Sequence, residues 1–292
     1  MQIISKRKIW FIFSGSLVVA SIAASLVWGL NFGIDFSGGS LAEFEFSQQR
    51  PANDEIKESL KEINLSGLDV AISGEKNVIL RFKDTEKRVE MENKLKEKFP
   101  DASEVNFESV GPTIGRELKI NSVKALVLVI IGIVIYVAWA FRHVSEPIAS
   151  WKYGVAAVIA LIHDVLIVVG VFAILGRFYG VEVGVPFIAA LLTILGYSVN
   201  DTIVVFDRTR ENLAKISGDY DGIVNTSINE TIARSINTSF TTFLALTAVY
   251  IFGGETTKYF MLALMVGIVV GTYSSIFLAS PIMVVWEKFN RK

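Results

Sequence analysis

The sequence contains no cysteine and few histidines, and each shortage excludes a kind of site. Without cysteine the chain has neither a disulfide framework nor a thiolate metal site, although the redox compartment stays undetermined. Its two histidines, His143 and His163, are too few for a His-rich metal centre. We therefore expect no bound metal or organic cofactor.

A surplus of charge of either sign is also missing. The 292 residues include 28 basic and 29 acidic side chains, and a net charge of −1 gives no electrostatic reason to expect a nucleic-acid partner. Apolar residues are abundant instead, with 52% of the chain hydrophobic and a mean hydropathy of +0.49. An ordinary soluble domain is less apolar than this, so the charges must be concentrated outside long apolar runs.

The first apolar run extends from Ile9 to about Leu30 and follows the basic cluster Lys6-Arg7-Lys8. A secretory signal peptide would have a shorter core, of about 7–15 residues, and small residues after it. Here the small residues (20–25) lie inside the run. The pattern predicts an uncleaved spanning helix with its basic end in the cytoplasm.

A polar region follows, and between Asp35 and Lys119 it carries 13 basic and 18 acidic residues, a net charge of 13 − 18 = −5. Ala42, Phe44 and Phe46 alternate with glutamates, as in a strand with one wet face. A helix is expected after Pro51 with Asn53 as its cap, and further strands at 68–72, 78–82 and 104–110.

A second helix is expected over residues 85–99, with Val89, Leu95 and Phe99 on its apolar side. The resulting β-α-β-β-α-β order predicts a ferredoxin-like α+β domain inserted after the first span. Because that span begins with its basic end inside, the inserted domain should be extracytoplasmic. Gly111, Pro112 and Gly115 are expected to form a hinge between this domain and the next span.

Five more apolar runs are each near the roughly 20 residues that cross a bilayer, at 123–141, 151–175, 185–206, 236–252 and 259–286. The connecting segments rich in Lys and Arg fall on one side, together with the N-terminal cluster, and this places both termini in the cytoplasm. We predict a membrane bundle of six helices, divided into a first helix (1–30), an extracytoplasmic α+β domain (31–120) and a five-helix bundle (121–292).

Polar residues interrupt three of the predicted spans. Asp201 lies in the fourth, where a central aspartate costs roughly 2.5–3.5 kcal/mol and is therefore usually functional. Its neighbours along the helix include Asn200, Tyr197 and Thr193. Arg234 stands at the start of the fifth and continues as a polar stripe of Asn237, Thr238, Thr241 and Thr242. His163 and Asp164 lie near the middle of the third.

These residues suggest a proton path, in which a buried carboxylate near an arginine takes a proton from one side and releases it to the other. Asp201 would be the titrating group, with protons as the coupling ion, and Arg234 a movable counter-ion because arginine keeps its proton. Two structural alternatives stay open. Arg234 could pair with Glu230 one turn earlier, and His163 with Asp164 could be a satisfied pair that fixes helix packing.

Three motifs resemble those of the SecD/SecF protein-export membrane proteins, the third those of the SecF members in particular. They are FGIDFSGGS at 32–40, VGPTIGREL at 110–118 and GYSVNDTIVVFDR at 196–208. The resemblance covers nearly the whole chain and implies membership of the RND superfamily. It also implies that Asp201 and Arg234 are the family's proton-relay pair, and that the Asp35 motif is a structural turn.

By this resemblance the chain pairs with SecD in the bacterial cytoplasmic membrane and works with the SecYEG channel and the SecA motor. It would use the proton-motive force to draw exported, unfolded polypeptides outward, surrounded by membrane lipid. An RND-type efflux subunit is the alternative, although such pumps have larger external domains. An intramembrane aspartyl protease would need facing carboxylates, for which Asp164 and Asp201 are the one deep pair.

Overall fold

The computed structural model describes residues 1–142 and 149–290, which form two compact units. A membrane unit comprises residues 1–31 and 123–292, and a small unit comprises residues 32–122. His143, Arg291 and Lys292, which entered the sequence predictions, lie outside the described residues.

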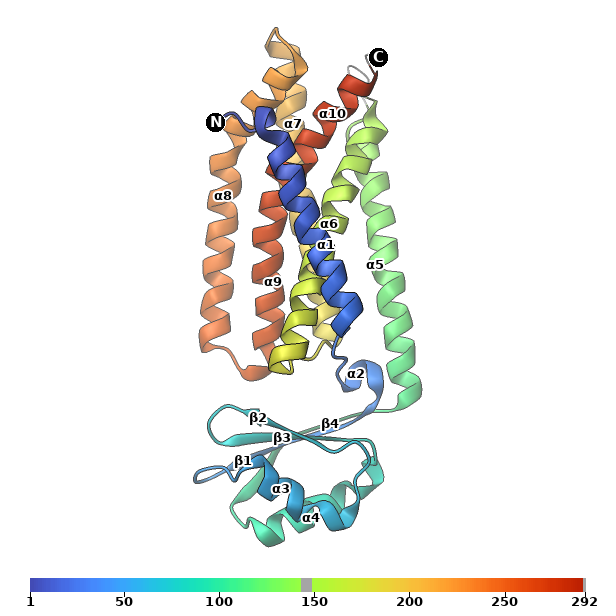
Figure 1. Ribbon diagram of the computed structural model, residues 1–292, viewed down its shortest axis with the longest axis vertical. Helices are drawn as coiled ribbons and strands as arrows, with labels where there is room; N and C mark the ends of the chain where they lie inside the picture. Colours follow the sequence, from blue (N-terminus) through green and yellow to red (C-terminus); the bar gives the residue numbers. More distant parts are fainter. Residues whose placement is uncertain (143–148, 291–292) are drawn as a thin grey trace. The chain divides into compact units, whose positions relative to one another are not determined.

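Long helices build the membrane unit (Figure 1). In order along the chain they are α1 (Arg7–Trp28), α5 (Pro112–Ala140), α6 (Ser150–Tyr179), α7 (Val185–Lys215), α8 (Tyr220–Phe252), α9 (Glu255–Ser274) and α10 (Ser280–Asn290). A short 3₁₀ turn, η1 (Ile4–Lys6), precedes α1, and a π-helical turn, η4 (Ser275–Ala279), joins α9 to α10. Within the described residues, six helical stretches are long and apolar enough to cross a membrane, which confirms the predicted number.

The fifth of these stretches begins much earlier than the sequence predicted. Helix α8 starts at Tyr220, so Arg234 lies near its middle and the expected start at Ile236 is wrong. Ile223, Val224 and Ile228 are buried at helical spacing in the part that was missed. An apolar run ends where charges appear, but a helix continues as long as one of its faces is buried.

Close contacts between helices depend on glycines. A Cβ added to Gly170 of α6 would lie 2.5 Å from the Cα of Ser21 in α1, and one added to Gly267 of α9 would lie 2.2 Å from the Cδ1 of Ile194 in α7. One turn further, a Cβ at Gly271 would lie 2.9 Å from the Cβ of Ser198. Small residues thus let these helix backbones approach closely, as is common in membranes.

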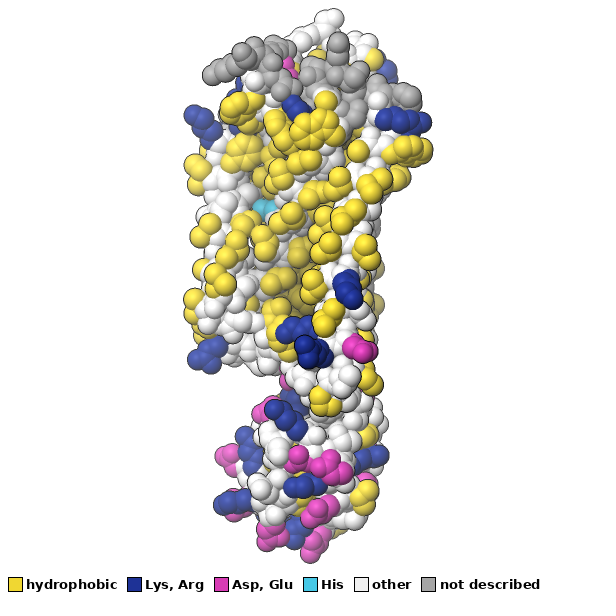
Figure 2. All heavy atoms as spheres, turned by 90° about the vertical axis from the view of Figure 1, so that its right-hand side faces the viewer, with side chains coloured by type: hydrophobic (Ala, Val, Ile, Leu, Met, Phe, Trp, Pro, Cys, Tyr) yellow, Lys and Arg dark blue, Asp and Glu magenta, His cyan; other side chains and the backbone are white. Residues whose placement is uncertain are grey.

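Two helices of the membrane unit bury little of their surface within the chain. Few residues in the apolar spans of α5 and α8 are buried, and the exposed ones include Leu128, Trp139 and Leu244. Figure 2 shows a face on which hydrophobic side chains cover the helical unit, whereas charged side chains gather over the small unit. Lipid or a partner protein must cover such a surface.

An antiparallel sheet with strand order β2-β3-β1-β4 forms the centre of the small unit. Its elements are α2 (Ile34–Ser37), β1 (Gly39–Phe46), α3 (Asn53–Ser59), η2 (Lys61–Ile63), β2 (Asp69–Ser73), β3 (Asn77–Phe82), η3 (Thr85–Lys87), α4 (Arg88–Lys98) and β4 (Ala102–Val110). Helices α3 and α4 lie on one side of the sheet (Figure 1). Ala42, Phe44 and Phe46 belong to the core between the sheet and these helices. They are at most 1% exposed, as their alternation predicted.

Two details of the small unit differ from the predictions. Asn53 does not cap α3; Ala52 occupies the cap position, and the Asn53 side chain donates to the carbonyl oxygen of Val70 at 3.1 Å. Val89 was expected on the apolar side of the second helix but is exposed, and Met91 is buried beside Leu95 instead. The buried pair is spaced by four residues, which places both on one helix face.

The predicted hinge residues lie where β4 passes into α5. Gly111 precedes the helix, and Pro112 is its first residue, a position that proline favours because its missing N–H needs no partner there. Gly115 comes close to the 34–38 turn, since a Cβ added to it would lie 3.2 Å from the backbone nitrogen of Gly38. The start of α5 is thus packed against the turn that follows α1.

Gly267→Ala should destabilise the membrane unit by about 1–3 kcal/mol, because the added methyl overlaps the buried Ile194 side chain. The measurement is the free energy of unfolding of the purified chain in detergent. Gly132→Ala is the matched control, since a Cβ there meets nothing within 4 Å. Equal stability of the two variants would contradict the packing described.

Candidate functional site

A cavity of about 280 Å³ lies between α7 and α8 and contains the residues that the sequence singled out. Residues from both helices line it: Tyr197, Asn200, Asp201, Val204, Arg234, Ser235 and Thr238. The structure therefore brings Asp201 and Arg234 to one hollow at the same level of the bundle. Because α8 starts at Tyr220, Arg234 lies within the helix and not at its first turn.

The Asp201 carboxylate is half-buried and asymmetrically hydrogen-bonded. Its Oδ1 accepts a hydrogen bond from the Ser235 hydroxyl at 2.5 Å. Its Oδ2 is buried and has no hydrogen-bond partner among the described residues. Ser275, in the π-helical turn, lies beside the same carboxylate. One oxygen is thus held by a hydroxyl, while the other is available for a proton.

Arg234 is exposed and lines the cavity without forming an ion pair with Asp201 among the described residues. The alternative partner, Glu230, is engaged elsewhere. It accepts hydrogen bonds from the Arg208 Nε at 2.6 Å and from the Asn212 Nδ2 at 2.7 Å. A Glu230–Arg234 pair is therefore not formed, and Arg234 lines the cavity instead.

The remaining polar residues at the cavity connect three helices. The Tyr197 hydroxyl donates to Ser239 Oγ at 3.2 Å, and Ser239 is hydrogen-bonded to Thr272 of α9 at 2.5 Å. Asn200 and Thr238 are exposed on the lining. The hydroxyls of the polar stripe, in contrast, bond mainly to their own helix, as Thr241 does to the Thr238 carbonyl oxygen at 2.9 Å.

His163 and Asp164 lie in a separate buried cluster where α6, α7 and α9 meet. Asp164 is fully buried and accepts hydrogen bonds from Ser198 at 2.6 Å and Ser274 at 2.8 Å. Its other oxygen lies 2.9 Å from Nδ1 of His163. Asp164 thus connects three helices through its hydrogen bonds, and it shares no hydrogen-bond partner with Asp201 in the described part of the chain.

Sequence reasoning missed the serines that hold both carboxylates. Ser198, Ser235 and Ser274 are nearly completely buried, and each donates to an aspartate. Their signal was available, since a hydroxyl inside an apolar span needs a partner. The π-helical turn at Ser275–Ala279 has no comparable signal, although such turns are frequent at functional sites.

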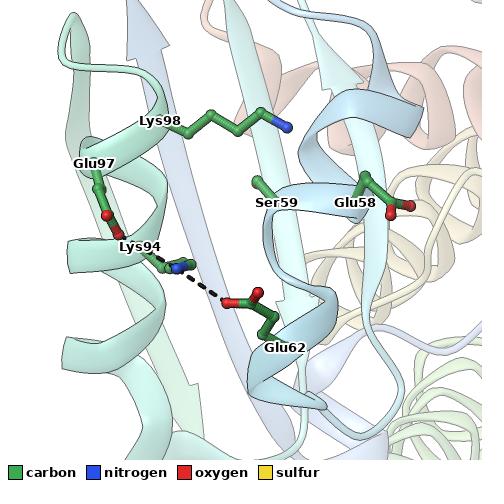
Figure 3. Close-up of a pocket in the computed structure, with 6 residues that line it drawn as sticks. All are labelled: Glu58, Ser59, Glu62, Lys94, Glu97 and Lys98. Atoms are coloured by element: carbon green, nitrogen blue, oxygen red, sulfur yellow. Dashed lines mark ion pairs between the residues drawn. The ribbon is translucent and has the colours of Figure 1, made fainter.

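A second hollow, of about 380 Å³, lies in the small unit between the α3–η2 segment and α4 (Figure 3). Charged residues dominate its lining, and Lys94 bridges Glu62 at 3.0 Å and Glu97 at 3.4 Å. Hydrogen bonding to Glu62 raises the pKa of Lys94 above its usual value. Exposed pairs of this kind are solvated and weak, so this hollow offers no evident chemistry.

Residues 1–142 and 149–290 contain no group of three or more His, Asp or Glu side chains that could hold a metal ion. The two deep aspartates also have separate hydroxyl partners, whereas an aspartyl protease needs carboxylates that share a proton.

Ser198→Ala should destabilise the chain by about 1–3 kcal/mol, because it removes a donor from a fully buried carboxylate. Thr241→Ala is the control and should change the free energy of unfolding by less than about 0.5 kcal/mol, since that hydroxyl is exposed. Unfolding of both variants in the same detergent gives the comparison, and a loss confined to Thr241→Ala would count against the cluster.

Comparison with known proteins identifies the family of this chain. The sequence profile of the family described as protein export membrane protein SecD/SecF, C-terminal, matches residues 90–289, and that of the SecD/SecF GG motif matches residues 27–49. The protein translocase subunit SecF of Thermobaculum terrenum is 41% identical over 303 aligned positions, covering 98% of this chain and 94% of that protein.

Relatives that are longer than this chain also match. The protein translocase subunit SecDF of Bacillus subtilis is 38% identical over 97% of this chain, which spans 38% of that protein. The crystal structure of SecDF from Thermus thermophilus, described as a translocon-associated membrane protein, superposes with a TM-score of 0.85 at 34% identity. It covers 98% of this chain, which again spans 38% of the solved one. These matches over nearly the whole sequence show that the chain belongs to the SecD/SecF family of protein-export membrane proteins.

Proposed function

We propose that this chain is a non-catalytic accessory subunit of the Sec protein-export translocase. It pairs with SecD and uses the proton-motive force to promote movement of polypeptides across the cytoplasmic membrane. The observation that carries this proposal is the Asp201 carboxylate, which has one unpartnered oxygen and faces a cavity shared with Arg234. The relatives described above are named as translocase subunits, so the efflux alternative is not favoured.

The proton cycle follows from the charges at this cavity. When Asp201 is ionised, the guanidinium of Arg234 is attracted to it across a medium of low dielectric, where Coulomb energies are large. When a proton binds Oδ2, that attraction ends and the Arg234 side chain can move away. Moving one charge through 100 mV is worth about 2.3 kcal/mol, enough to bias a conformational change.

Contact with SecD would cover the exposed polar side chains of α7 and α8. Arg234, Asn237 and Thr238 are exposed on α8, and Asn200 is exposed on α7. Lipid is a poor neighbour for such side chains, because polar groups in the hydrocarbon region face protein or water-filled cavities. This chain matches 38% of the length of the SecDF proteins described above, and their names combine SecD with SecF.

The domain division proposed is a first helix (1–30), an extracytoplasmic domain (31–120) and a five-helix bundle (121–292). The strand order β2-β3-β1-β4 and the β-α-β-β-α-β sequence of elements support a ferredoxin-like domain. Arginines and lysines near the two ends of the chain support cytoplasmic termini. Protease accessibility of the small unit from the cytoplasmic side would contradict this topology.

The extracytoplasmic domain would rock about Gly111, Pro112 and Gly115 as Asp201 changes its protonation state. Gly111 links the end of β4 to Pro112, the first residue of α5, and this change from strand to helix is the support for a pivot at this point. The moving domain would hold an exported polypeptide, delivered by SecA through SecYEG, against backsliding. Spin labels on the two sides of Pro112 that keep one distance with and without a proton gradient would remove this part of the proposal.

Asp201→Asn should leave the complex with SecD assembled and abolish the proton-dependent stimulation of export, because the amide cannot exchange a proton. Export of a model precursor into inverted vesicles, with and without a proton gradient, gives the measurement. Asp207→Asn is the control, since Asp207 lies on the same helix but pairs with Arg210. Full stimulation by the Asp201 variant would refute the mechanism.

Thr241→Cys should cross-link to a cysteine placed in SecD, because the polar face of α8 is expected to meet that partner. The absence of native cysteine makes single substitutions specific. Ile236→Cys is the control: Ile236 is exposed but lies on the opposite side of the helix and should face lipid. Cross-linking at position 236 and none at 241 would contradict the proposed interface.

A further inference from the structure

A nitrogen in the buried His163–Asp164 cluster is left without a partner. His163 is 4% exposed, and its Nδ1 lies 2.9 Å from Asp164 Oδ1. Its Nε2 is buried and makes no hydrogen bond among the described residues. Buried polar atoms are nearly always hydrogen-bonded, so this exception calls for an explanation.

The Asp164 carboxylate, in contrast, is fully occupied. Oδ2 accepts hydrogen bonds from two hydroxyls, those of Ser198 and Ser274, and Oδ1 lies against the imidazole. Such a set of donors suits an ionised carboxylate. With a neutral imidazole, the cluster would then carry an uncompensated negative charge in apolar surroundings, which is costly. A proton on His163 removes that charge.

No other charged group compensates Asp164 in the described part of the chain. From α9, the Tyr273 ring stacks beside His163 with centroids 6.1 Å apart. From α1, Ser14 is hydrogen-bonded to the Tyr273 hydroxyl at 3.0 Å. From α7 and α9, Ser198 and Ser274 supply hydroxyls to the aspartate. The charge of this cluster therefore depends on the imidazole alone.

We propose that His163 is a second proton-binding site of this chain. Its Nδ1 faces the ionised Asp164, and its Nε2 takes the proton. The inference rests on the proposed proton-driven function and adds a site to it. His163 would gain a proton without passing it to Asp164, whose oxygens are already occupied. The chain would then carry two proton-binding groups, Asp201 and His163.

The two groups are joined through α7 and the π-helical turn. Ser198, which bonds Asp164, lies one helical turn before Asp201. Ser275 of the turn donates to the Ser198 carbonyl oxygen at 3.3 Å and is hydrogen-bonded to Thr202 at 2.9 Å. A charge change at His163 would therefore act on the same helix segment that holds the cavity carboxylate.

Nuclear magnetic resonance of this chain, labelled with ¹⁵N-histidine and assembled with unlabelled SecD, tests the site directly. The chain has two histidines, so His143→Asn leaves the signal of His163 alone. We expect this signal to change between the neutral and the doubly protonated imidazole when a proton gradient is imposed. A signal that reports one protonation state with and without the gradient would overturn the proposal.

His163→Asn tests whether the proton is used, because the asparagine amide can still donate to Asp164 in place of Nδ1–H but offers no base at the Nε2 position. Proton-dependent stimulation of export should fall at least about tenfold, while the amount of chain assembled with SecD stays equal to that of the natural chain. Unchanged stimulation would overturn the proposal. Failure of the transport function itself would show separately, as an Asp201→Asn variant that behaves like the natural chain while the His163 signal still changes with the gradient.

Discussion

The cost of a carboxylate inside an apolar bundle governs the arrangement of this molecule. Asp164 and Asp201 both lie in spans that are otherwise apolar, and each needs donors that the surrounding hydrocarbon cannot provide. Buried serines from neighbouring helices donate to both, Ser198 and Ser274 to Asp164 and Ser235 to Asp201. Both oxygens of Asp164 have partners, whereas Oδ2 of Asp201 has no hydrogen-bond partner among the described residues.

Glycines make this supply of donors possible. Serine side chains are short, so they reach a carboxylate on another helix only where the backbones come close. Gly267 and Gly271 provide that approach between α9 and α7, and the π-helical turn directly after Ser274 re-aims Ser275 toward α7. Helix packing and hydrogen bonding are therefore coupled: a larger residue at Gly267 or Gly271 would also displace a hydrogen-bond donor.

Much of the fold and part of the site could be predicted from the sequence. The six spans and the succession of strands and helices along the small unit follow from hydrophobic periodicity, and Asp201 stood out because an acid in an apolar run is costly. The start of α8 at Tyr220 could not be predicted, because buried residues on one face, and not a continuous apolar run, sustain its first turns. For Ser235 and Ser274 the sequence signals only that a hydroxyl in an apolar span needs a partner. Which aspartate each serine meets depends on the rotation and register of the packed helices, and local sequence does not encode these.

The central claim is that Asp201 exchanges a proton while the protein works. Infrared difference spectroscopy of the complex with SecD, recorded as a proton gradient is imposed across the membrane, observes this carboxyl group itself. The account predicts a protonated-carboxyl band that changes with the gradient and is absent from the Asp201→Asn protein. A spectrum in which that band is missing, or in which it persists unchanged in the variant, would contradict it.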